Sequence, residues 1–361
     1  MEERLHLKGL NGIRTIAAVC VVLSHLRVLL PEFPVIQGNS FDMTNYAVTM
    51  FFTLSGFLIT YLLFMEKKKK EISIKNFYIR RILRIWPLYF IYLALAFITI
   101  YIYEPGKLPG ALPYYLFFAA NVPSIFNTHL PHLAQYWSLG VEEQFYIFWP
   151  WLMKRSRNAL KALIIFTVCF FLLVLFSHIT NVEWNGISLL RVLEINRFEC
   201  MSIGGIAALL CLQRHDLFIK TVTHPFTQVI CWLSLLLMFV NKFHIPYFPD
   251  NGLVALVTCG LIVNLSFNKK TLISLENRFF DLLGKVSYGI YIIHPVVIFY
   301  YGMLLEKINT GTAGKLLLVY GGVLLLTVLF AWLSYELLEK IFLRLKDNFS
   351  TIKSADSRYS D

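Results

Sequence analysis

Apolar stretches of about the length of a membrane-spanning helix recur along the whole chain, with short polar segments between them. A helix needs roughly 20 mostly apolar residues to cross a bilayer. Ten stretches approach or reach this length, and the one that ends at Met153 is short, so we expect its helix to begin among the preceding polar residues. The pattern predicts an all-α fold, a polytopic membrane helix bundle with about ten transmembrane helices. The predicted spans are Leu10–Leu30, Tyr46–Met65, Trp86–Tyr103, Val141–Met153, Leu160–Ser177, Leu189–Leu212, Phe226–Val240, Leu253–Phe267, Leu283–Leu305 and Leu316–Phe342.

The basic residues are unevenly divided between the two sides of these spans. Alternate polar segments hold 25 of the 33 Lys and Arg residues, whereas the segments between them hold three, Lys107, Lys242 and Lys307. Lys and Arg accumulate on the cytoplasmic side of membrane proteins. The distribution therefore predicts that the N- and C-termini are both cytoplasmic, which requires an even number of spans.

Composition supports the same class of protein. Hydrophobic residues make up 57% of the chain and charged residues 15%, against about 25% charged residues in average soluble domains. These values exclude a disordered chain, a coiled coil and an ordinary soluble enzyme. The formal net charge of +11 is then inner-surface charge that attracts anionic membrane lipids, and no nucleic-acid partner is expected.

The spacing of the spans leaves no room for a second folded unit. The longest predicted outside loop runs from about Glu104 to Gly140, so we expect one transmembrane domain over residues 1–345 and a polar cytoplasmic tail over 346–361. The six cysteines lie in apolar stretches without CxxC spacing, which favours buried free thiols over a disulfide framework or a metal site. We find no internal repeat, which argues against transporter folds built from inverted repeats.

Ionisable side chains inside a membrane are costly, so they are functional candidates. Arg14 and His25 lie in the first span, 11 residues apart. On a helix this is three turns plus about 20°, so both occupy one face, about 16 Å apart. Arg14 near the cytoplasmic surface would hold an anionic ligand, while the deeper His25 can accept and return a proton. The alternative is a snorkelling arginine and a histidine that bonds between helices.

A basic segment precedes the third span. Anchoring to anionic lipids at the inner surface explains Lys67–Lys70. Arg80, Arg81 and Arg84 follow at helical spacing, and guanidinium forks bind phosphates well. These three arginines are the predicted phosphate seat of a membrane enzyme that uses a cytosolic nucleotide-bearing donor, with lipid anchoring as the alternative.

The segment WSLGVEEQFY, residues 137–146, places two adjacent carboxylates, Glu142 and Glu143, close to Trp137. We expect these residues to open a membrane helix at the outer face, where the helix dipole favours carboxylates and Ser138 can cap. The dipole explains one carboxylate but not both, so a functional role is predicted.

Three further polar residues fall inside predicted spans. Arg197 and Glu199 are two positions apart and do not face each other on a helix, so each is expected to pair with another span. His294 precedes Pro295, which kinks a helix and frees a carbonyl group. A structural histidine that satisfies such a carbonyl is the favoured interpretation, and a catalytic histidine is the alternative.

Several of these segments resemble acyltransferase family 3, membrane proteins that O-acylate cell-envelope carbohydrates. Leu10–Leu26 is similar to the family's first span, with Arg14 and His25 in its Arg-x10-His pattern, and Trp137–Pro150 is the closest match. Together the similar segments cover nearly the whole chain in the family's order. The others are Phe51–Thr60, Phe77–Pro87, Arg197–Gly204, Leu283–Pro295 and Tyr335–Lys340.

Two departures from the family pattern change what we expect. Asn11 stands where the family usually has an acidic residue, which leaves a role for that carboxylate unsupported. No further span and no extracytoplasmic esterase-like domain follows the tenth predicted helix. We therefore expect a short, stand-alone form in which the membrane domain and its outer loops bind the acceptor.

The resemblance implies transfer of an acyl group, commonly acetyl from acetyl-CoA, onto a carbohydrate hydroxyl. His25 would act as the general base on that hydroxyl or carry the acyl group covalently, and both routes stay open. Either Glu142 or Glu143 would orient His25 or bind acceptor hydroxyls, and Trp137 would offer a face for sugar stacking. The CoA phosphates would bind Arg80, Arg81, Arg84 and Arg14, while Arg197, Glu199 and His294 would complete a polar network.

The expected partners are an acyl-CoA, a carbohydrate acceptor that is free or lipid-linked, and membrane lipids. Acetyl-CoA or another acyl-CoA is a donor substrate, and no permanently bound cofactor or metal is expected. The implied location is a bacterial-type inner (plasma) membrane, crossed many times. The competing hypothesis is a transporter or flippase of a lipid-linked sugar that uses Arg14 and His25 as a proton relay.

Overall fold

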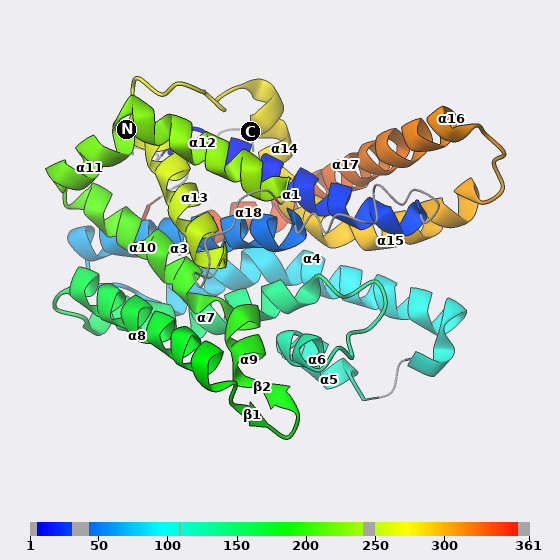
Figure 1. Cartoon of the computed structure of the whole chain (residues 1–361), viewed down its shortest axis with the longest axis horizontal. Coiled ribbons are helices and arrows are strands. Elements are labelled where there is room, and N and C mark those ends of the chain that lie inside the picture. The colour runs from blue at the N-terminus through cyan, green and yellow to red at the C-terminus, as the bar shows by residue number, and fades with distance from the viewer. Residues whose placement is uncertain (1–5, 31–42, 108–109, 241–249, 353–361) are drawn as a thin grey trace.

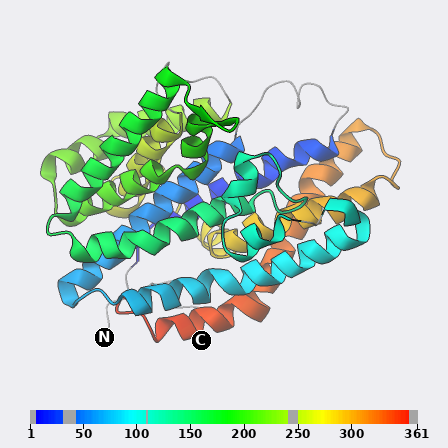
Figure 2. The same cartoon turned by 90° about the horizontal axis from the view of Figure 1, so that it is seen from below.

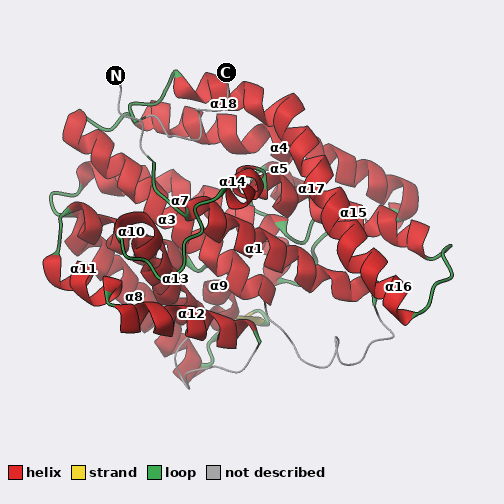
Figure 3. Cartoon of the chain, turned by 90° about the horizontal axis from the view of Figure 1, so that it is seen from above, coloured by secondary structure: helices red, strands yellow, loops and turns green. Residues whose placement is uncertain are grey.

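The computed structural model describes residues 6–30, 43–107, 110–240 and 250–352. Helices make up almost all of this part of the chain (Figure 3), and its β structure is a single hairpin of β1 (Glu183–Trp184) and β2 (Ile187–Ser188). The α-helices are α1 (Leu10–His25), α3 (Met43–Lys69), α4 (Ile74–Tyr103), α5 (Leu112–Leu116), α6 (Asn121–Ile125), α7 (Tyr136–Arg155), α8 (Ala159–Thr180), α9 (Leu189–Asn196), α10 (Phe198–Leu212), α11 (Asp216–Thr223), α12 (Pro225–Phe239), α13 (Asp250–Phe267), α14 (Arg278–Lys285), α15 (Ser287–Leu305), α16 (Thr312–Leu317), α17 (Val323–Ser334) and α18 (Lys340–Asp347). Shorter helical turns are η1 (Leu26–Leu29), η2 (Pro105–Lys107), η3 (Leu318–Gly322) and η4 (Tyr335–Glu339), of which η3 and η4 are π-helical.

Eight helices or continuous helix stacks in the described residues are long and apolar enough to cross a membrane. The pair α11 and α12, bent by 62° at the break between them, makes a ninth if it forms one span. The remaining predicted span corresponds to α7, which has 20 residues and begins at Tyr136, among the polar residues where we expected its start. The predicted all-α polytopic membrane bundle is confirmed, while the count of ten and the orientation stay predictions. The eight spans are Leu10–Leu29, Met43–Lys69, Ile74–Tyr103, Ala159–Thr180, Leu189–Leu212, Asp250–Phe267, Ser287–Leu305 and Thr312–Asp347.

Helix α4 begins well before the predicted start of its span at Trp86. Its first residue is Ile74, because the Ser73 hydroxyl caps the helix by accepting a hydrogen bond from the Asn76 N–H at 3.3 Å. The basic segment is therefore part of the same continuous helix as the apolar span. This extension fixes the positions of its arginines relative to the rest of the bundle.

Two predicted spans are broken inside the bundle. The span Leu189–Leu212 is interrupted at Arg197, which adopts the left-handed conformation with φ of 45° between α9 and α10. The span Leu283–Leu305 divides at Val286 into α14 and α15. Non-helical backbone within a membrane protein is tolerated where protein or a water-filled cavity surrounds it. The first break places Arg197, which the sequence singles out, at a turn of the backbone inside the bundle. The second break precedes α15, the helix that carries Tyr291 and His294.

Helix α3 packs against α1, α7, α10, α12 and α13, most extensively against α10. A Cβ atom added at Gly56 of α3 would lie 1.9 Å from the Met201 carbonyl oxygen, and one added at Gly204 of α10 would lie 2.1 Å from the Thr53 carbonyl oxygen. Small residues let membrane helices approach closely. This tight crossing holds α3 as a fixed wall for the elements around it.

Helix α1, which carries Arg14 and His25, packs against α3, α13, α14 and α15. Figure 1 shows α15 and α17 as a helical hairpin that extends from one side of the bundle. In Figure 2, α18 lies alongside α4, which brings the last described residues next to the basic segment.

Candidate active site

A large open cavity lies among α1, α3, α4, α7, α14 and α15. It contains about 1740 Å³ of empty space, including the solvent at its mouth. Its lining includes His6 and Leu7 as well as Lys346, Ser350, Thr351 and Ile352, so the first and last described parts of the chain meet at one cavity. All four predicted donor-binding arginines also line it, and we call this group the arginine end. Its members are Arg14, Arg80, Arg81 and Arg84.

Arg80 is held by two partners from different elements. Its Nη2 donates to Glu66 Oε2 of α3 at 3.0 Å, and its Nη1 donates to the Phe349 carbonyl oxygen at 2.8 Å. The Glu66 side chain is only 3% exposed, and its other carboxylate oxygen accepts from the Ser73 N–H. This ion pair fixes the guanidinium at the cavity wall and neutralises part of its charge.

Arg81 and Arg84 have different surroundings. The guanidinium of Arg81 lies 5.6 Å from the ring centres of both Phe77 and Tyr146, and its buried Nε has no hydrogen-bond partner in the part of the chain that the structure describes. Cation–π contacts of this kind hold a guanidinium without neutralising it. Arg84 forms no hydrogen bond or ion pair with another described residue, and it lines this cavity and a smaller neighbouring one. Arg84 is thus a cation available to an anionic ligand.

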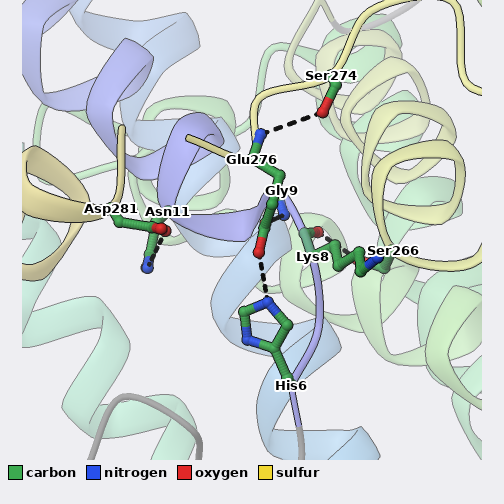
Figure 4. Close-up of polar contacts among 8 residues, drawn as sticks. All are labelled: His6, Lys8, Gly9, Asn11, Ser266, Ser274, Glu276 and Asp281. Carbon is green, nitrogen blue, oxygen red and sulfur yellow. Dashed lines mark hydrogen bonds and ion pairs between the residues drawn. The ribbon is translucent and has the colours of Figure 1, made fainter. Parts of the chain in front are cut away.

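Arg14 lies in α1, as predicted, and its Nη1 donates to Asn11 Oδ1 at 3.0 Å. Asn11 Nδ2 in turn donates to Asp281 Oδ1 of α14 at 3.2 Å (Figure 4). The position where the family usually has an acidic residue is therefore supplied with a carboxylate from a distant helix. Glu276 closes the same wall, since its two oxygens bond His6 Nε2 at 2.5 Å and the Gly9 N–H at 2.7 Å.

His25 is the last residue of α1, and its ring lies against that of His294 in α15. The two ring centres are 5.0 Å apart and the ring planes are tilted by 40°. His25 Nδ1 bonds the Val21 carbonyl oxygen at 2.8 Å, and His294 Nδ1 bonds the Ile290 carbonyl oxygen at 3.3 Å. This carbonyl is not the one that Pro295 frees, which belongs to Tyr291, so the structural interpretation of His294 stays a prediction. The structure places His294 beside the predicted catalytic histidine. We call these two residues the histidine pair.

Tyr291 connects the cavity to the histidine pair. It lines the cavity, and its ring centre is 6.2 Å from that of His294. Its hydroxyl lies 2.5 Å from Ser138 Oγ and donates to the Gln135 carbonyl oxygen at 3.0 Å. A ligand whose phosphates contact the arginine end can therefore extend toward the histidine pair as far as this tyrosine.

The predicted explanation of Glu142 and Glu143 as residues that open a helix is wrong. Helix α7 begins at Tyr136, so both carboxylates lie well inside it, beyond reach of its first N–H groups. The expected cap is also wrong, because Ser138 lies within the helix and its hydroxyl bonds Tyr291 and the Gln135 carbonyl instead. The helix begins among the expected polar residues, at Tyr136, two positions before the expected cap at Ser138.

The two carboxylates face different surroundings. Glu142 lines the cavity and accepts hydrogen bonds from the hydroxyls of Ser55, at 2.5 Å, and Tyr146. Glu143 accepts from Trp86 Nε1 at 3.4 Å, and its buried Oε1 has no partner among the described residues. The hydrogen bonds of the described residues do not connect either carboxylate to His25, so neither orients it directly in this structure.

Arg197 pairs with another helix, as predicted. Its Nη1 donates to the Asn45 carbonyl oxygen at 3.1 Å and to Thr49 Oγ1 at 3.2 Å, both in α3. Its guanidinium also lies 5.1 Å from the Trp137 ring centre. One face of the tryptophan expected to stack on a sugar is therefore already covered by this cation, while Phe52 packs edge-on against the ring.

Glu199 differs from the expected cross-span pairing. Its Oε1 accepts from the adjacent Cys200 Sγ at 3.5 Å, and its buried Oε2 has no partner in the described part of the chain. Because Arg197 turns out of the helix in the left-handed conformation, it bonds α3 and leaves the neighbouring carboxylate. Glu199 is thus a buried acceptor close to the break between α9 and α10.

Sequence reasoning missed several residues of the site. Glu66, Asp281 and Glu276 carry no local motif, and Tyr291 lies in the family-like segment Leu283–Pro295 without being singled out. Their roles become visible when the helices are assembled. Within the described residues, no group of three or more His, Cys, Asp or Glu side chains is arranged to hold a metal ion.

Known proteins resemble this chain over most of its length. It is 25% identical to the peptidoglycan O-acetyltransferase OatA of Listeria monocytogenes, over 82% of this chain and 50% of that protein. It is 26% identical to the putative peptidoglycan O-acetyltransferase YrhL of Bacillus subtilis, over 94% of this chain and 55% of that protein. A putative O-acetyltransferase of Staphylococcus aureus is 25% identical, over 93% of this chain and 57% of that protein. The chain thus spans about half the length of these curated relatives. No solved structure matches it.

A family model also matches most of the chain. The model of the acyltransferase family 3 domain matches residues 7–336, which include the arginine end and the histidine pair. This match confirms the resemblance seen in the sequence motifs and the predicted acyltransferase class. The chain belongs to acyltransferase family 3.

Proposed function

We propose that this protein transfers an acyl group, acetyl from acetyl-CoA, onto a hydroxyl of a cell-envelope glycan, and that it works in the inner membrane of a bacterium. The observation that carries the proposal is one cavity lined both by the arginine end and by Tyr291, whose ring contacts the histidine pair. A long ligand with an anionic head and a reactive tail fits such a cavity.

The donor is argued from charge. CoA carries several phosphates on a nucleotide and a thioester at the end of a long flexible arm. Guanidinium groups bind phosphates through charge-assisted, often bidentate hydrogen bonds. Arg84 forms no hydrogen bond or ion pair among the described residues, although Glu339 lies within electrostatic range of it, and Arg81 is held between aromatic rings. Both therefore supply charge for these phosphates. Arg80 and Arg14, each bonded within the protein, shape the wall.

The acyl-transfer step is assigned to His25. Its Nδ1 bonds a carbonyl, which leaves Nε2 as the atom that takes a proton from the acceptor hydroxyl or attacks the thioester carbonyl. In the first route the hydroxyl oxygen attacks the acyl carbon while the carbon–sulfur bond breaks. In the second route the acyl group resides on His25 before the hydroxyl accepts it.

The acceptor is argued from the relatives and from the second polar region. The names of two relatives specify peptidoglycan, which supports a cell-wall glycan as the class of acceptor. Around the break at Arg197, the unpartnered Oε2 of Glu199 and the partly exposed ring of Trp137 offer polar and aromatic groups to a sugar. Glu142 lines the cavity and Glu143 is the next residue of the same helix, so Glu142 is the carboxylate of this pair that can meet the donor.

The test is incubation of the purified protein with labelled acetyl-CoA and cell-wall glycan fragments, with His25→Ala beside wild type. We expect label on the glycan with wild type and a loss of at least ~1000-fold with His25→Ala, in the range lost with a general base or nucleophile. His178→Ala is the matched control, because His178 is an exposed histidine at the end of α8. Transfer that survives in His25→Ala would contradict the assignment, and glycan movement without acyl transfer would favour the transporter.

A further inference from the structure

The histidine pair has a hydrogen-bonding pattern that fixes the tautomer of both rings. Each Nδ1 bonds a backbone carbonyl one helical turn earlier, Val21 for His25 and Ile290 for His294. A carbonyl oxygen can only accept a hydrogen bond, so each Nδ1 must carry the proton. A neutral imidazole has one N–H, so in both rings Nε2 is then a lone-pair acceptor.

The two Nε2 atoms are both acceptors and cannot bond each other. Because His294 is buried, leaving its Nε2 without a donor is costly. His294 is 0% exposed, and its Nε2 is buried without a hydrogen-bond partner among the described residues. A buried acceptor without a partner costs roughly 1–3 kcal/mol. Natural proteins retain such an atom at few places, and each calls for an explanation. A proton placed between the two rings would satisfy it.

We propose that His294 is the proton partner of His25, a positioning residue that stabilises the protonated form of His25 during acyl transfer. The inference rests on the proposed function and takes the general-base route. The hydroxyl proton moves to His25 Nε2, and this new N–H is shared between the oxygen it came from and His294 Nε2. Ring centres 5.0 Å apart, with the ring planes tilted by 40°, place the two imidazole rings close enough for such a bond of ~3 Å between nitrogen atoms to form.

The complete step balances. The acceptor oxygen forms the ester bond with the acyl carbon as its proton moves to His25. The carbon–sulfur bond breaks, and CoA leaves as a thiolate. The thiolate then takes the proton from His25, which becomes neutral again, and His294 returns to its unpartnered state. His294 never contacts the substrate in this scheme, which agrees with its complete burial.

The experiment measures kcat and the KM for acetyl-CoA of the purified protein with a glycan acceptor. We expect His294→Ala to lower kcat about 100-fold, as expected for the weakening of general-base catalysis, with KM within twofold of wild type. His294→Gln should recover about tenfold of this loss, because its side-chain carbonyl accepts an N–H. His294→Phe fills the ring volume without an acceptor and should be as slow as His294→Ala, so these two variants decide the matter if the alanine variant does not fold.

Thr327→Val is the matched control, since Thr327 of α17 is also 0% exposed with an unpartnered buried oxygen. It should keep wild-type kcat, which separates loss of a buried polar atom in general from loss of this one. A kcat within threefold of wild type in His294→Ala would overturn the proposal. So would equal rates for the Gln and Phe variants, or a rise in KM that accounts for the loss.

The same assay separates this inference from the proposed function. If wild type transfers acetyl and His25→Ala does not, while His294→Ala is unimpaired, only the role of His294 fails. If wild type transfers no acyl group, or His25→Ala transfers it normally, the proposed function or its catalytic residue fails and the inference falls with it.

Discussion

Two arginines of the arginine end, Arg14 and Arg80, hold their polar atoms in the opposite way to the histidine pair. At the arginine end, Arg80 is bonded across elements to Glu66, and Arg14 is linked through Asn11 to Asp281. In the histidine pair, each ring bonds the backbone of its own helix, and the buried Nε2 of His294 is left without a partner in the described residues.

The difference teaches what each region is built to do. Side chains that are bonded in advance lose little freedom when a ligand arrives, so the arginine end is suited to positioning a donor. Atoms that are left unsatisfied gain a partner when charge or a proton arrives, so the histidine pair is suited to a chemical step. Changes at the first region should therefore affect stability and KM, and changes at the second should affect kcat.

Among variants that test this difference between the two regions, Glu66→Gln should have the largest effect, on the free energy of unfolding. The substitution removes the carboxylate charge that pairs with Arg80, and breaking a fully buried pair costs about 3–5 kcal/mol. Because the Arg80 side chain is 11% exposed and keeps its bond to the Phe349 carbonyl, we expect a loss of about 2 kcal/mol. Unfolding in mixed detergent micelles measures the change, and kcat of the folded fraction should stay near wild type.

Glu71→Gln is the control, because its ion pair with Lys154 at 2.8 Å is exposed. The hydrogen bond and charge of Lys154 lower the pKa of the Glu71 carboxyl. A lowered pKa stabilises the fold above the unfolded-state pKa, and this contribution is lost as the pH falls through the folded-state value. Exposed pairs contribute little, so at neutral pH this variant should match wild type. If both variants lost the same free energy of unfolding, the Glu66–Arg80 pair would contribute no more than an exposed surface pair. The arginine end would then not be a preformed binding site.

A smaller effect is expected from Arg84→Ala. Arg84 forms no hydrogen bond or ion pair among the described residues, so we expect its removal to leave the fold intact and to take away a phosphate contact. The KM for acetyl-CoA should rise about tenfold, which corresponds to ~1.4 kcal/mol. In Arg84→Lys the KM should rise less, because the positive charge remains while the guanidinium fork is lost. Steady-state kinetics over a range of acetyl-CoA concentrations measures both.

Lys68→Ala tests whether any inner-surface cation would serve. Lys68 belongs to the exposed run that the sequence assigns to lipid anchoring, and its ammonium lies over the Phe64 ring. We expect an unchanged KM. A rise equal to that of Arg84→Ala would mean that general surface charge, and not the cavity, attracts the donor.

The sequence predicted the bundle because an apolar stretch long enough to cross a bilayer has few other structures open to it. It misplaced the start of α4, since a count of apolar residues stops at the first arginines while a capped helix continues through them. It also missed the break at Arg197, because hydropathy carries no information about a left-handed backbone conformation.

For the site, short-range motifs predicted more than long-range pairs. His25 and Arg14 share one helix, so their spacing alone placed them on one face. The Asn11–Asp281 contact joins residues 270 positions apart, and nothing in either local segment specifies it. Such pairs depend on how the helices pack, which a single sequence does not state. The contact of His25 with His294 was missed for the same reason.

The smallest expected effect lies where the two regions meet, at Tyr291. Tyr291→Phe removes the hydroxyl that bonds Ser138 and the Gln135 carbonyl but keeps the ring against His294. One neutral hydrogen bond contributes about 1 kcal/mol, so we expect kcat to fall roughly threefold to fivefold with little change in the KM for acetyl-CoA.

Tyr301→Phe is the matched control on the same helix. The Tyr301 hydroxyl also donates to a carbonyl, that of Leu318 at 3.2 Å, but Tyr301 does not line the cavity. Its kcat should equal that of wild type. A fall in kcat for Tyr291→Phe alone would place this tyrosine with the histidine pair, because its hydroxyl then positions the reacting groups. A rise in the KM for acetyl-CoA alone would place it with the arginine end. Tyr291 would then be a donor-binding residue, and the donor-binding region would extend as far as the neighbour of His294.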